Sequence, residues 1–350
     1  MNSIEERMAR QDNDYSHIET DYYHGTGLKL VDNINGKVSQ PDAIHRSETV
    51  SIIVPSYEGH IEVLDLLNRL ACQSFKNFEI IIVDDGSPNP LFDRIEQQEV
   101  PLPIKLIRQN KNKGRSYTRN TGLIISESSN VVFVDHDTLI DNNFVANFAT
   151  RLTNTDNCVF LGFREEVTTE AIELGRRADY KKDWRNSITI DKDFQPYTVV
   201  NQKVLQEMRE YKLLEETDFL KALGHGAVLG YWNLASAVVS HGIGVKRKDA
   251  LMAKGFPEQG FNGWGFEDSA LGAKLISQGG LVIPCVDIAS FHLKKPTNSI
   301  WRRNKDHEID NNTAAYSALL RSPLEDVGRL EQRKISKIGV YSNIELYEVD

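Results

Sequence analysis

The chain has 350 residues, 40% of them hydrophobic and 26% charged, which is an ordinary globular composition with enough apolar residues for a sizeable core. Its formal net charge of −9 argues against general nucleic-acid binding, which requires a basic surface. The three cysteines show no metal-ligand spacing, and no apolar run reaches the length of a membrane span. With an N-terminus that lacks a signal sequence, these features favour a cytoplasmic protein, and they leave peripheral membrane association open.

Residues 1–48 are polar and have no sustained period, which predicts an N-terminal arm or a small extension, with a disordered tail as the alternative. Strands are expected where short apolar runs end at turn residues, and helices where apolar residues recur every three or four positions. Up to residue 134 this pattern predicts strands at 50–54, 78–83, 104–107 and 131–134, and helices at 63–70 and 117–126.

Strands that alternate with helices predict an α/β fold with a mostly parallel central sheet and flanking helices. In such a sheet the loops that follow the strands lie along one edge. We therefore expect Pro55, Asp84 and Asp135 to converge there.

Beyond residue 164 the periodicity weakens and the charge rises, up to about residue 223. A solvated helical face is the simpler interpretation, and a lid or an acceptor-binding insertion is the alternative. Apolar order resumes at 235–239 and 244–246, and is followed by a predicted helix at 267–278 and short apolar runs at 281–284 and 288–291. The last forty or so residues are polar and compatible with helix.

Two acids follow the buried run at 131–134 directly, in the sequence Asp135-His136-Asp137. Carboxylates are costly to bury unless they are paired, protonated or bound to a cation. Oxygen ligands at the carboxyl end of a strand suit Mg²⁺ or Mn²⁺ that holds a diphosphate. A chance triplet in an acidic loop is the alternative. His292, also placed after a predicted strand, could complete such a site or be purely structural.

A second motif, Gly263-Trp264-Gly265-Phe266-Glu267-Asp268, opens the predicted helix at 267–278. Glycines allow close approach of a ligand to the backbone, and the flat Trp264 ring suits the C–H face of a sugar. An ionised carboxylate at a helix N-terminus can remove a proton from a nearby hydroxyl. The alternative is that Glu267 and Asp268 only cap the helix and that Trp264 fills a core.

Several linked motifs together resemble GT-A glycosyltransferases of family 2 over about residues 50–300. The motifs that carry this resemblance in the first half are Ser51–Tyr57, Gln73–Phe75, Glu79–Ser87, Asn112–Gly114 and Arg119–Gly122. Asp135-His136-Asp137 then falls at the metal-binding DXD motif of that family. Phe261–Asp268 is similar to a motif of β-1,4-galactosyltransferases, and the region around His292 is similar to polypeptide N-acetylgalactosaminyltransferases.

The resemblance implies a GT-A domain at 49–300, with a nucleotide-binding half at 49–163, an acceptor and catalytic half at 164–300, and a C-terminal extension at 301–350. It also implies site roles. Residues expected to bind the nucleotide sugar are Pro55, Ser56, Tyr57, Asp84, Arg119, Asp135 and Trp264. Asp137, His292 and Asp135 would ligate Mn²⁺ or Mg²⁺, and Asp268 with Glu267 would form the catalytic pair, with Asp268 as the base.

The expected function is metal-dependent, inverting transfer of a hexose or N-acetylhexosamine from a UDP-sugar to a hydroxyl of a glycan, a lipid-linked sugar or a peptide. Three alternatives remain at this point: a retaining glycosyltransferase, a non-catalytic sugar-nucleotide-binding module and a nucleotidyltransferase. The last is disfavoured because Pro55-Ser56-Tyr57-Glu58, the loop after the first strand, has no basic residue to hold phosphate.

Overall fold

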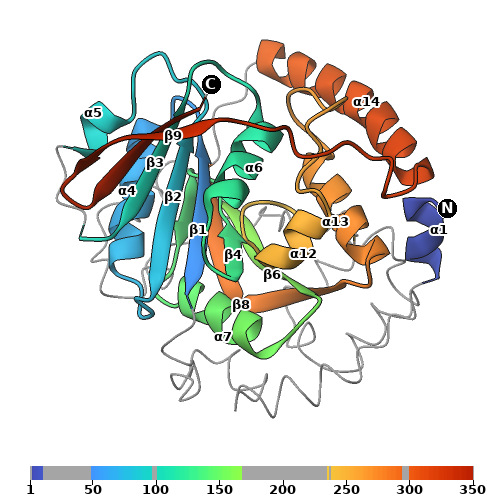
Figure 1. The fold of residues 1–350 in the computed structure, drawn as a ribbon, viewed down its shortest axis with the longest axis horizontal. Coiled ribbons are helices and arrows are strands. Elements are labelled where there is room, and N and C mark those ends of the chain that lie inside the picture. Colours follow the sequence, from blue (N-terminus) through green and yellow to red (C-terminus); the bar gives the residue numbers. More distant parts are fainter. Residues whose placement is uncertain are drawn as a thin grey trace.

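A ten-stranded sheet forms the centre of the molecule, and helices pack against it (Figure 1). The computed structural model describes residues 2–10, 49–96, 101–167, 235, 238–293 and 299–349. Its strands are β1 (Val50–Ser56), β2 (Phe78–Asp84), β3 (Ile104–Gln109), β4 (Asn130–Phe133), β5 (Thr138–Ile140), β6 (Cys158–Val167), β7 (Ile243–Lys246), β8 (Leu281–Leu293), β9 (Ile335–Tyr341) and β10 (Ile344–Val349). Across the sheet they follow the order β5-β8-β6-β7-β4-β1-β2-β3-β10-β9.

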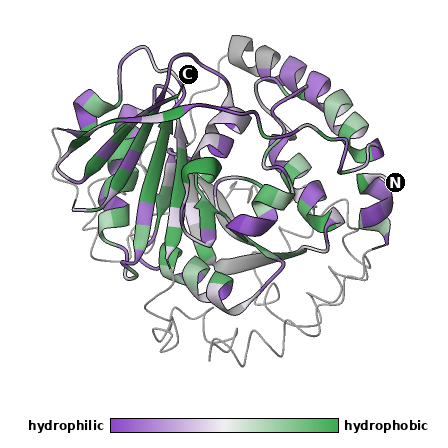
Figure 2. Ribbon diagram, viewed as in Figure 1, coloured by the Kyte–Doolittle hydropathy of each residue, from purple (hydrophilic) through white to green (hydrophobic). Residues whose placement is uncertain are grey.

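The parallel part of the sheet confirms the predicted α/β fold class. β1 pairs in parallel with β2 and β4, and β2 pairs in parallel with β3. All residues of β1 are buried, as a run of β-branched residues covered on both faces should be. Figure 2 shows these central strands as mainly hydrophobic. Ser56 lies opposite Asp84, and Ile53 opposite Phe133, so the carboxyl ends of the three strands meet at one edge, as predicted.

The other part of the sheet is mixed. β7 runs antiparallel to both β4 and β6, β8 runs parallel to β6, and β5 runs antiparallel to β8. The two apolar runs predicted at 281–284 and 288–291 form the single strand β8, whose pairing with β6 shifts register at Gly162 and Phe163. At 235–239 the described residues contain no strand.

The helices that pack around the sheet include all three that the sequence predicted. The described helices are α1 (Ile4–Ala9), α4 (His60–Ala71), α5 (Phe92–Ile95), α6 (Arg115–Ile125), α7 (Phe144–Asn154), α12 (Arg247–Met252), α13 (Glu267–Ser277) and α14 (Ser299–Arg321). In α4 the buried side chains include Val63, Leu66, Leu67 and Leu70, the apolar positions that predicted it. None of the helices in the described ranges is both long and apolar enough to cross a membrane.

Both ends of the chain take part in the packed body. In the segment predicted as an N-terminal arm, α1 is capped by Ser3 and buries Ile4 and Met8 completely. This helix packs against α13 and α14 (Figure 1). In the segment predicted as a C-terminal extension, β10 pairs in parallel with β3, and β9 forms the outer edge of the sheet. Residues 11–48 and 168–234, and with the latter most of the predicted insertion, lie outside the described residues.

Candidate active site

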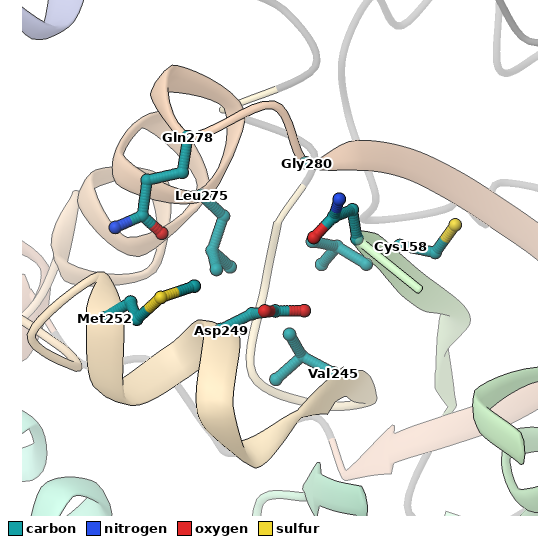
Figure 3. Close-up of a pocket in the computed structure, with 9 residues that line it drawn as sticks. Cys158, Val245, Asp249, Met252, Leu275, Gln278 and Gly280 are labelled. Carbon is teal, nitrogen blue, oxygen red and sulfur yellow. The ribbon is translucent and has the colours of Figure 1, made fainter. Parts of the chain in front are cut away.

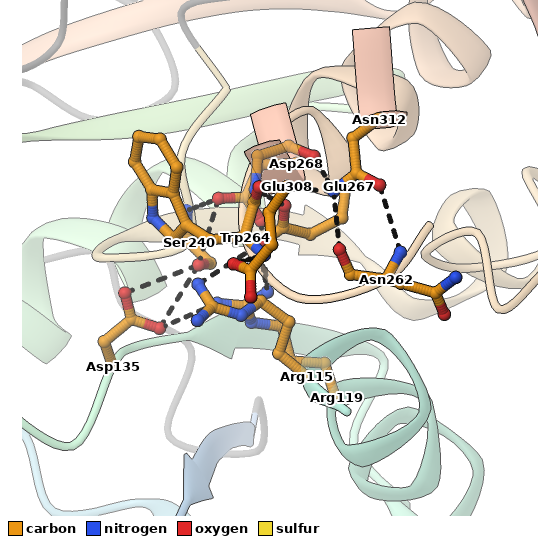
Figure 4. Close-up of polar contacts among 11 residues, drawn as sticks. Arg115, Arg119, Asp135, Ser240, Asn262, Trp264, Glu267, Asp268, Glu308 and Asn312 are labelled. Atoms are coloured by element: carbon orange, nitrogen blue, oxygen red, sulfur yellow. Dashed lines mark hydrogen bonds and ion pairs between the residues drawn. The ribbon is translucent and has the colours of Figure 1, made fainter. Parts of the chain in front are cut away.

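The guanidinium group of Arg119 lies at the centre of a group of carboxylates. It donates from Nη2 to Asp135 Oδ1 at 2.9 Å, and its Nη1 lies 3.5 Å from Glu267 Oε1 and 3.3 Å from Asp268 Oδ1 (Figure 4). Arg119 comes from α6, Asp135 from the loop after β4, and the other two from the start of α13. The arrangement therefore brings α6, the loop after β4 and the start of α13 together at the edge where the parallel strands end.

Burial and charge act in opposite directions on this cluster. Burial opposes the charge on Arg119, but the carboxylates of Asp268, Asp135 and Glu267 outweigh it and raise the pKa of Arg119 above its ordinary value. Burial also raises the pKa of Asp268 to about 7, although Arg119 acts against this shift. A carboxyl group in this range is close to the protonation equilibrium that suits a general base at neutral pH.

Ser240 links the carboxylates of Asp135 and Asp268, and no sequence motif indicated it. Its Oγ lies 3.2 Å from Asp135 Oδ1 and 3.2 Å from Asp268 Oδ2, and its backbone N–H donates to the same Asp268 oxygen at 3.1 Å. A hydroxyl carries a single proton, so Ser240 can donate to one carboxylate at a time. Its position only becomes apparent once β7 brings residue 240 next to β4.

The Gly263–Glu267 turn presents Trp264 beside this cluster (Figure 4). Gly263 and Gly265 have φ of 73° and 112°, and Phe266 is left-handed at 65°, so the backbone reverses sharply before α13. The N–H of Gly265 donates to Glu267 Oε2 at 2.9 Å, and Arg115 lies 3.5 Å from Oε1 of the same carboxylate. The carboxylate of Glu267 thus contacts the guanidinium groups of Arg115 and Arg119 through one oxygen and the backbone of its own turn through the other.

The loop after β2 is organised around Asp84 and Asp85. Asp84 accepts from Arg108 at 2.9 Å and from the N–H of Ser87 at 3.0 Å. Asp85, the second acid of this motif, accepts the backbone N–H groups of Lys113 and Gly114 at 2.7 and 3.0 Å. Burial raises the pKa of Asp85 to about 6 against these two hydrogen bonds.

The loop after β1 contains the other residues expected at the nucleotide. Pro55 and Ser56 are the last residues of β1, and Tyr57 is 43% exposed. The ring of His136 approaches the carbonyl of Pro55 at 3.1 Å, and it lies so close to Gly59 that a Cβ there would come within 2.2 Å of it. His136, the middle residue of the acidic triplet, therefore packs this loop against the end of β4.

The candidate metal ligands lie in the loop between β4 and β5 and on β8. Asp137 is buried directly before β5, and Thr138, the first residue of β5, pairs with His292 on β8. The side chain of His292 is outside the described part of the structure, and the side chains that are described contain no group of three metal-ligating residues. The donor types at the proposed ligand positions, two carboxylates at Asp135 and Asp137 and an imidazole at His292, nevertheless suit a divalent cation such as Mn²⁺.

A small cavity lies away from these residues, between α12, α13 and the start of β6 (Figure 3). Its lining includes Cys158, Asp249, Leu275 and Gln278, and none of the predicted site residues. Its volume is about 20 Å³, which is close to that of one water molecule and far too small for a sugar or a nucleotide. This cavity is therefore not a candidate site for a sugar or a nucleotide.

Comparison with known proteins gives a family match for part of the chain. Residues 51–211 match the model of glycosyl transferase family 2. This part of the chain is therefore similar to that family. Arg119 and its partner Asp135 lie inside the matched region. The other two partners of Arg119, Glu267 and Asp268 at the start of α13, lie beyond its end.

The individual relatives are distant in sequence. An uncharacterized glycosyltransferase, YfnE of Bacillus subtilis, is 27% identical over 273 residues, covering 71% of this chain and 65% of the relative. Hyaluronan synthase of Pasteurella multocida is 25% identical over 285 residues, covering 76% of this chain but 26% of the synthase. This chain thus spans less than two thirds of the length of either relative. Among solved structures, a mannosyltransferase of Pyrobaculum calidifontis, bound to GDP-mannose and Mn²⁺, superposes with a TM-score of 0.48 at 15% identity, over 92% of this chain and 80% of its own.

Proposed function

We propose that this protein is an inverting glycosyltransferase that moves a hexose or N-acetylhexosamine from a UDP-sugar to a hydroxyl acceptor. The observation that carries the proposal is the buried cluster in which Asp268 faces Arg119, Asp135 and Ser240 at the carboxyl edge of the parallel strands. Ligands of open α/β sheets bind along this edge. The hyaluronan synthase among the relatives supports sugar transfer as the general activity.

In this proposal Asp268 removes the proton from the attacking hydroxyl of the acceptor. The hydroxyl oxygen then forms the new bond to the anomeric carbon as the bond to the UDP leaving group breaks, which inverts the configuration. Ser240 and Arg119 orient the carboxylate of Asp268, and Trp264 with Glu267 contacts the sugar. We base this role of the Phe261–Asp268 segment on the resemblance of its sequence to a motif of β-1,4-galactosyltransferases. A retaining enzyme would not require a base at Asp268.

The donor would lie along the ends of β1, β2 and β4. Pro55, Ser56 and Tyr57 would contact the uracil and ribose. Asp84, which accepts a hydrogen bond from Arg108, would contact the same uridine. Asp135, Asp137 and His292 would hold Mn²⁺ or Mg²⁺, which would supply neutralisation of the negative charge on the leaving diphosphate. The acceptor proposed is a glycan, a lipid-linked sugar or a peptide side chain.

Substitution of the proposed base tests the mechanism most directly. In Asp268→Asn the side chain keeps its shape but cannot take a proton, so we expect turnover to fall by about 10²–10⁴-fold while the affinity for UDP is retained. The measurement is UDP release from a panel of sugar nucleotides, with UDP binding followed by calorimetry. Asp310→Asn, an exposed substitution on α14, is the matched control. Undiminished turnover in Asp268→Asn would refute the assignment, and anomer analysis of the product by NMR separates inversion from retention.

Removal of divalent cations tests the proposed metal. We expect EDTA to abolish transfer and to weaken UDP binding, and added Mn²⁺ to restore both, because the diphosphate would otherwise approach a group of carboxylates. Calorimetric titration of UDP with and without Mn²⁺ checks binding independently of turnover. Full activity and unchanged UDP affinity in EDTA would exclude the metal role.

A further inference from the structure

A line of side chains on α14 holds the turn that leads into the proposed base. The carboxamide of Asn312 is 1% exposed and takes part in four backbone contacts. Its Nδ2 lies 3.1, 3.2 and 2.9 Å from the carbonyl oxygens of Asn262, Trp264 and Gly265, and its Oδ1 accepts the N–H of Asn262 at 3.0 Å. The Nδ2 group carries two hydrogens, so it can donate to two of these three carbonyl oxygens at a time. One side chain from α14 therefore contacts the backbone of this turn at Asn262, Trp264 and Gly265.

Glu308, one helical turn earlier, holds the same turn at Trp264. Its Oε2 accepts the backbone N–H of Trp264 at 2.9 Å. It also lies so close to Gly263 that a Cβ on that residue would come within 2.2 Å of the carboxyl carbon, and Gly263 has a positive φ of 73°. The ammonium group of Lys305 lies 3.7 Å from the centre of the Trp264 ring, so both the backbone and the ring of this residue contact α14.

Tyr316 extends the line by a further turn. Its ring stacks on that of Phe266 with centroids 5.2 Å apart and an interplanar angle of 19°. Phe266 is the left-handed residue directly before Glu267 and Asp268. Residues 308, 312 and 316 are spaced by four and therefore share one face of α14, which we call the α14 seam. Figure 4 shows Glu308 and Asn312 pointing from this helix toward the turn.

The turn requires such support because its own sequence specifies little. Gly263 and Gly265 have wide conformational freedom, and fixing the backbone of one residue costs about 1–2 kcal/mol. The Gly263–Phe266 backbone must nevertheless be fixed for Trp264 and Asp268 to keep their relative positions. The seam provides hydrogen-bond partners to the backbone of Asn262, Trp264 and Gly265 and an aromatic contact to Phe266, so it supplies this order from a distant part of the chain.

We propose that Glu308 and Asn312 are positioning residues for glycosyl transfer, which set the geometry of Trp264 and Asp268 without touching the substrate. This inference rests on the proposed function of Asp268. It assigns a role in the reaction to a helix that lies beyond the matched family region and within the segment that the sequence predicts to be an extension.

Paired substitutions on adjacent residues of α14 test the seam. Asn312→Ala removes the four contacts, and Asn311→Ala makes the same change at the exposed neighbour. We expect Asn312→Ala to lower kcat by about 10–100-fold, because small displacements of reacting groups carry penalties of this size. UDP affinity should stay unchanged, and amide hydrogen exchange at 262–266 should become faster. Asn311→Ala should match the unsubstituted protein in all three measurements.

Glu308 offers a conservative rescue. Glu308→Gln keeps an oxygen that accepts the N–H of Trp264, so we expect near-normal kcat, whereas Glu308→Ala should behave like Asn312→Ala. A role limited to folding would instead lower the melting temperature and leave the kcat of the folded fraction unchanged, and this result would overturn the proposal. Faster exchange without a loss of kcat would overturn it as well. If the unsubstituted protein transfers no sugar from any donor, the proposed function itself fails, and the seam loses its role in catalysis with it.

Discussion

Two buried cations show how neighbouring groups decide whether a charge is kept. Arg119 is surrounded by Asp135, Glu267 and Asp268, and its pKa rises above the ordinary value despite burial. Lys274 on α13 is 2% exposed, and its ammonium group donates to the carbonyl of Gly255. Burial, with a contribution from Lys254, lowers the pKa of Lys274 to about 7. A cation in contact with carboxylates stays charged, whereas one in contact with a carbonyl is close to losing its proton at neutral pH.

Lys274 should make stability depend on pH. Its pKa is about 7 in the folded protein and 10.5 ordinarily, so between these values the unfolded chain binds more protons and the free energy of unfolding rises with pH. Lys274→Met should remove this rise, which urea unfolding at pH 7, 8 and 9 would measure. Lys248→Met, at an exposed lysine, is the control and should keep it. An unchanged pH slope in Lys274→Met would contradict the prediction.

At the scale of elements, the segment 322–334 connects α14 to the far edge of the sheet and is fastened as it passes α6 (Figure 1). Lys254 donates to the carbonyl oxygens of Leu324, Glu325 and Val327 at 2.8–2.9 Å. Arg333 forms a buried ion pair with Glu258 and donates to the carbonyl of Tyr117 at 2.9 Å. Glu258 also accepts from Asn120 at 2.7 Å, so α6, the turn after α12 and this segment share one polar network.

Loss of the Arg333 charge should be costly. Arg333→Met leaves the carboxylate of Glu258 buried without its ion-pair partner, and breaking such a pair typically costs about 3–5 kcal/mol. Chemical denaturation should show this loss, and the double variant Arg333→Met/Glu258→Gln should regain part of it. Arg329→Met, at an exposed position in the same segment, should stay within about 0.5 kcal/mol of the unsubstituted protein. A loss below about 1 kcal/mol in Arg333→Met would show that the network does not hold the segment.

At the scale of the whole molecule, the candidate site depends on contacts between residues far apart in the chain. Ser240 lies 105 positions from Asp135 and 28 from Asp268, and it contacts both. Glu308 lies 44 positions from Trp264. These contacts require that β7 pairs with β4 and that α14 packs on α13. The geometry of the cluster therefore depends on the packing of the sheet, α13 and α14 together.

The sequence by itself determined the α/β class, the strands β1 to β4 and the acidic motifs at their ends, because local alternation of apolar runs and turn residues is strong there. It could not indicate Ser240, Glu308 or Asn312, since a polar residue without a local pattern has no signal until its partner is known. Only the tertiary structure decided that Arg119 is surrounded by carboxylates and that α14 holds the Trp264 turn. The physical reason is that burial and long-range contacts, not residue type, set the charge state and the orientation of these side chains.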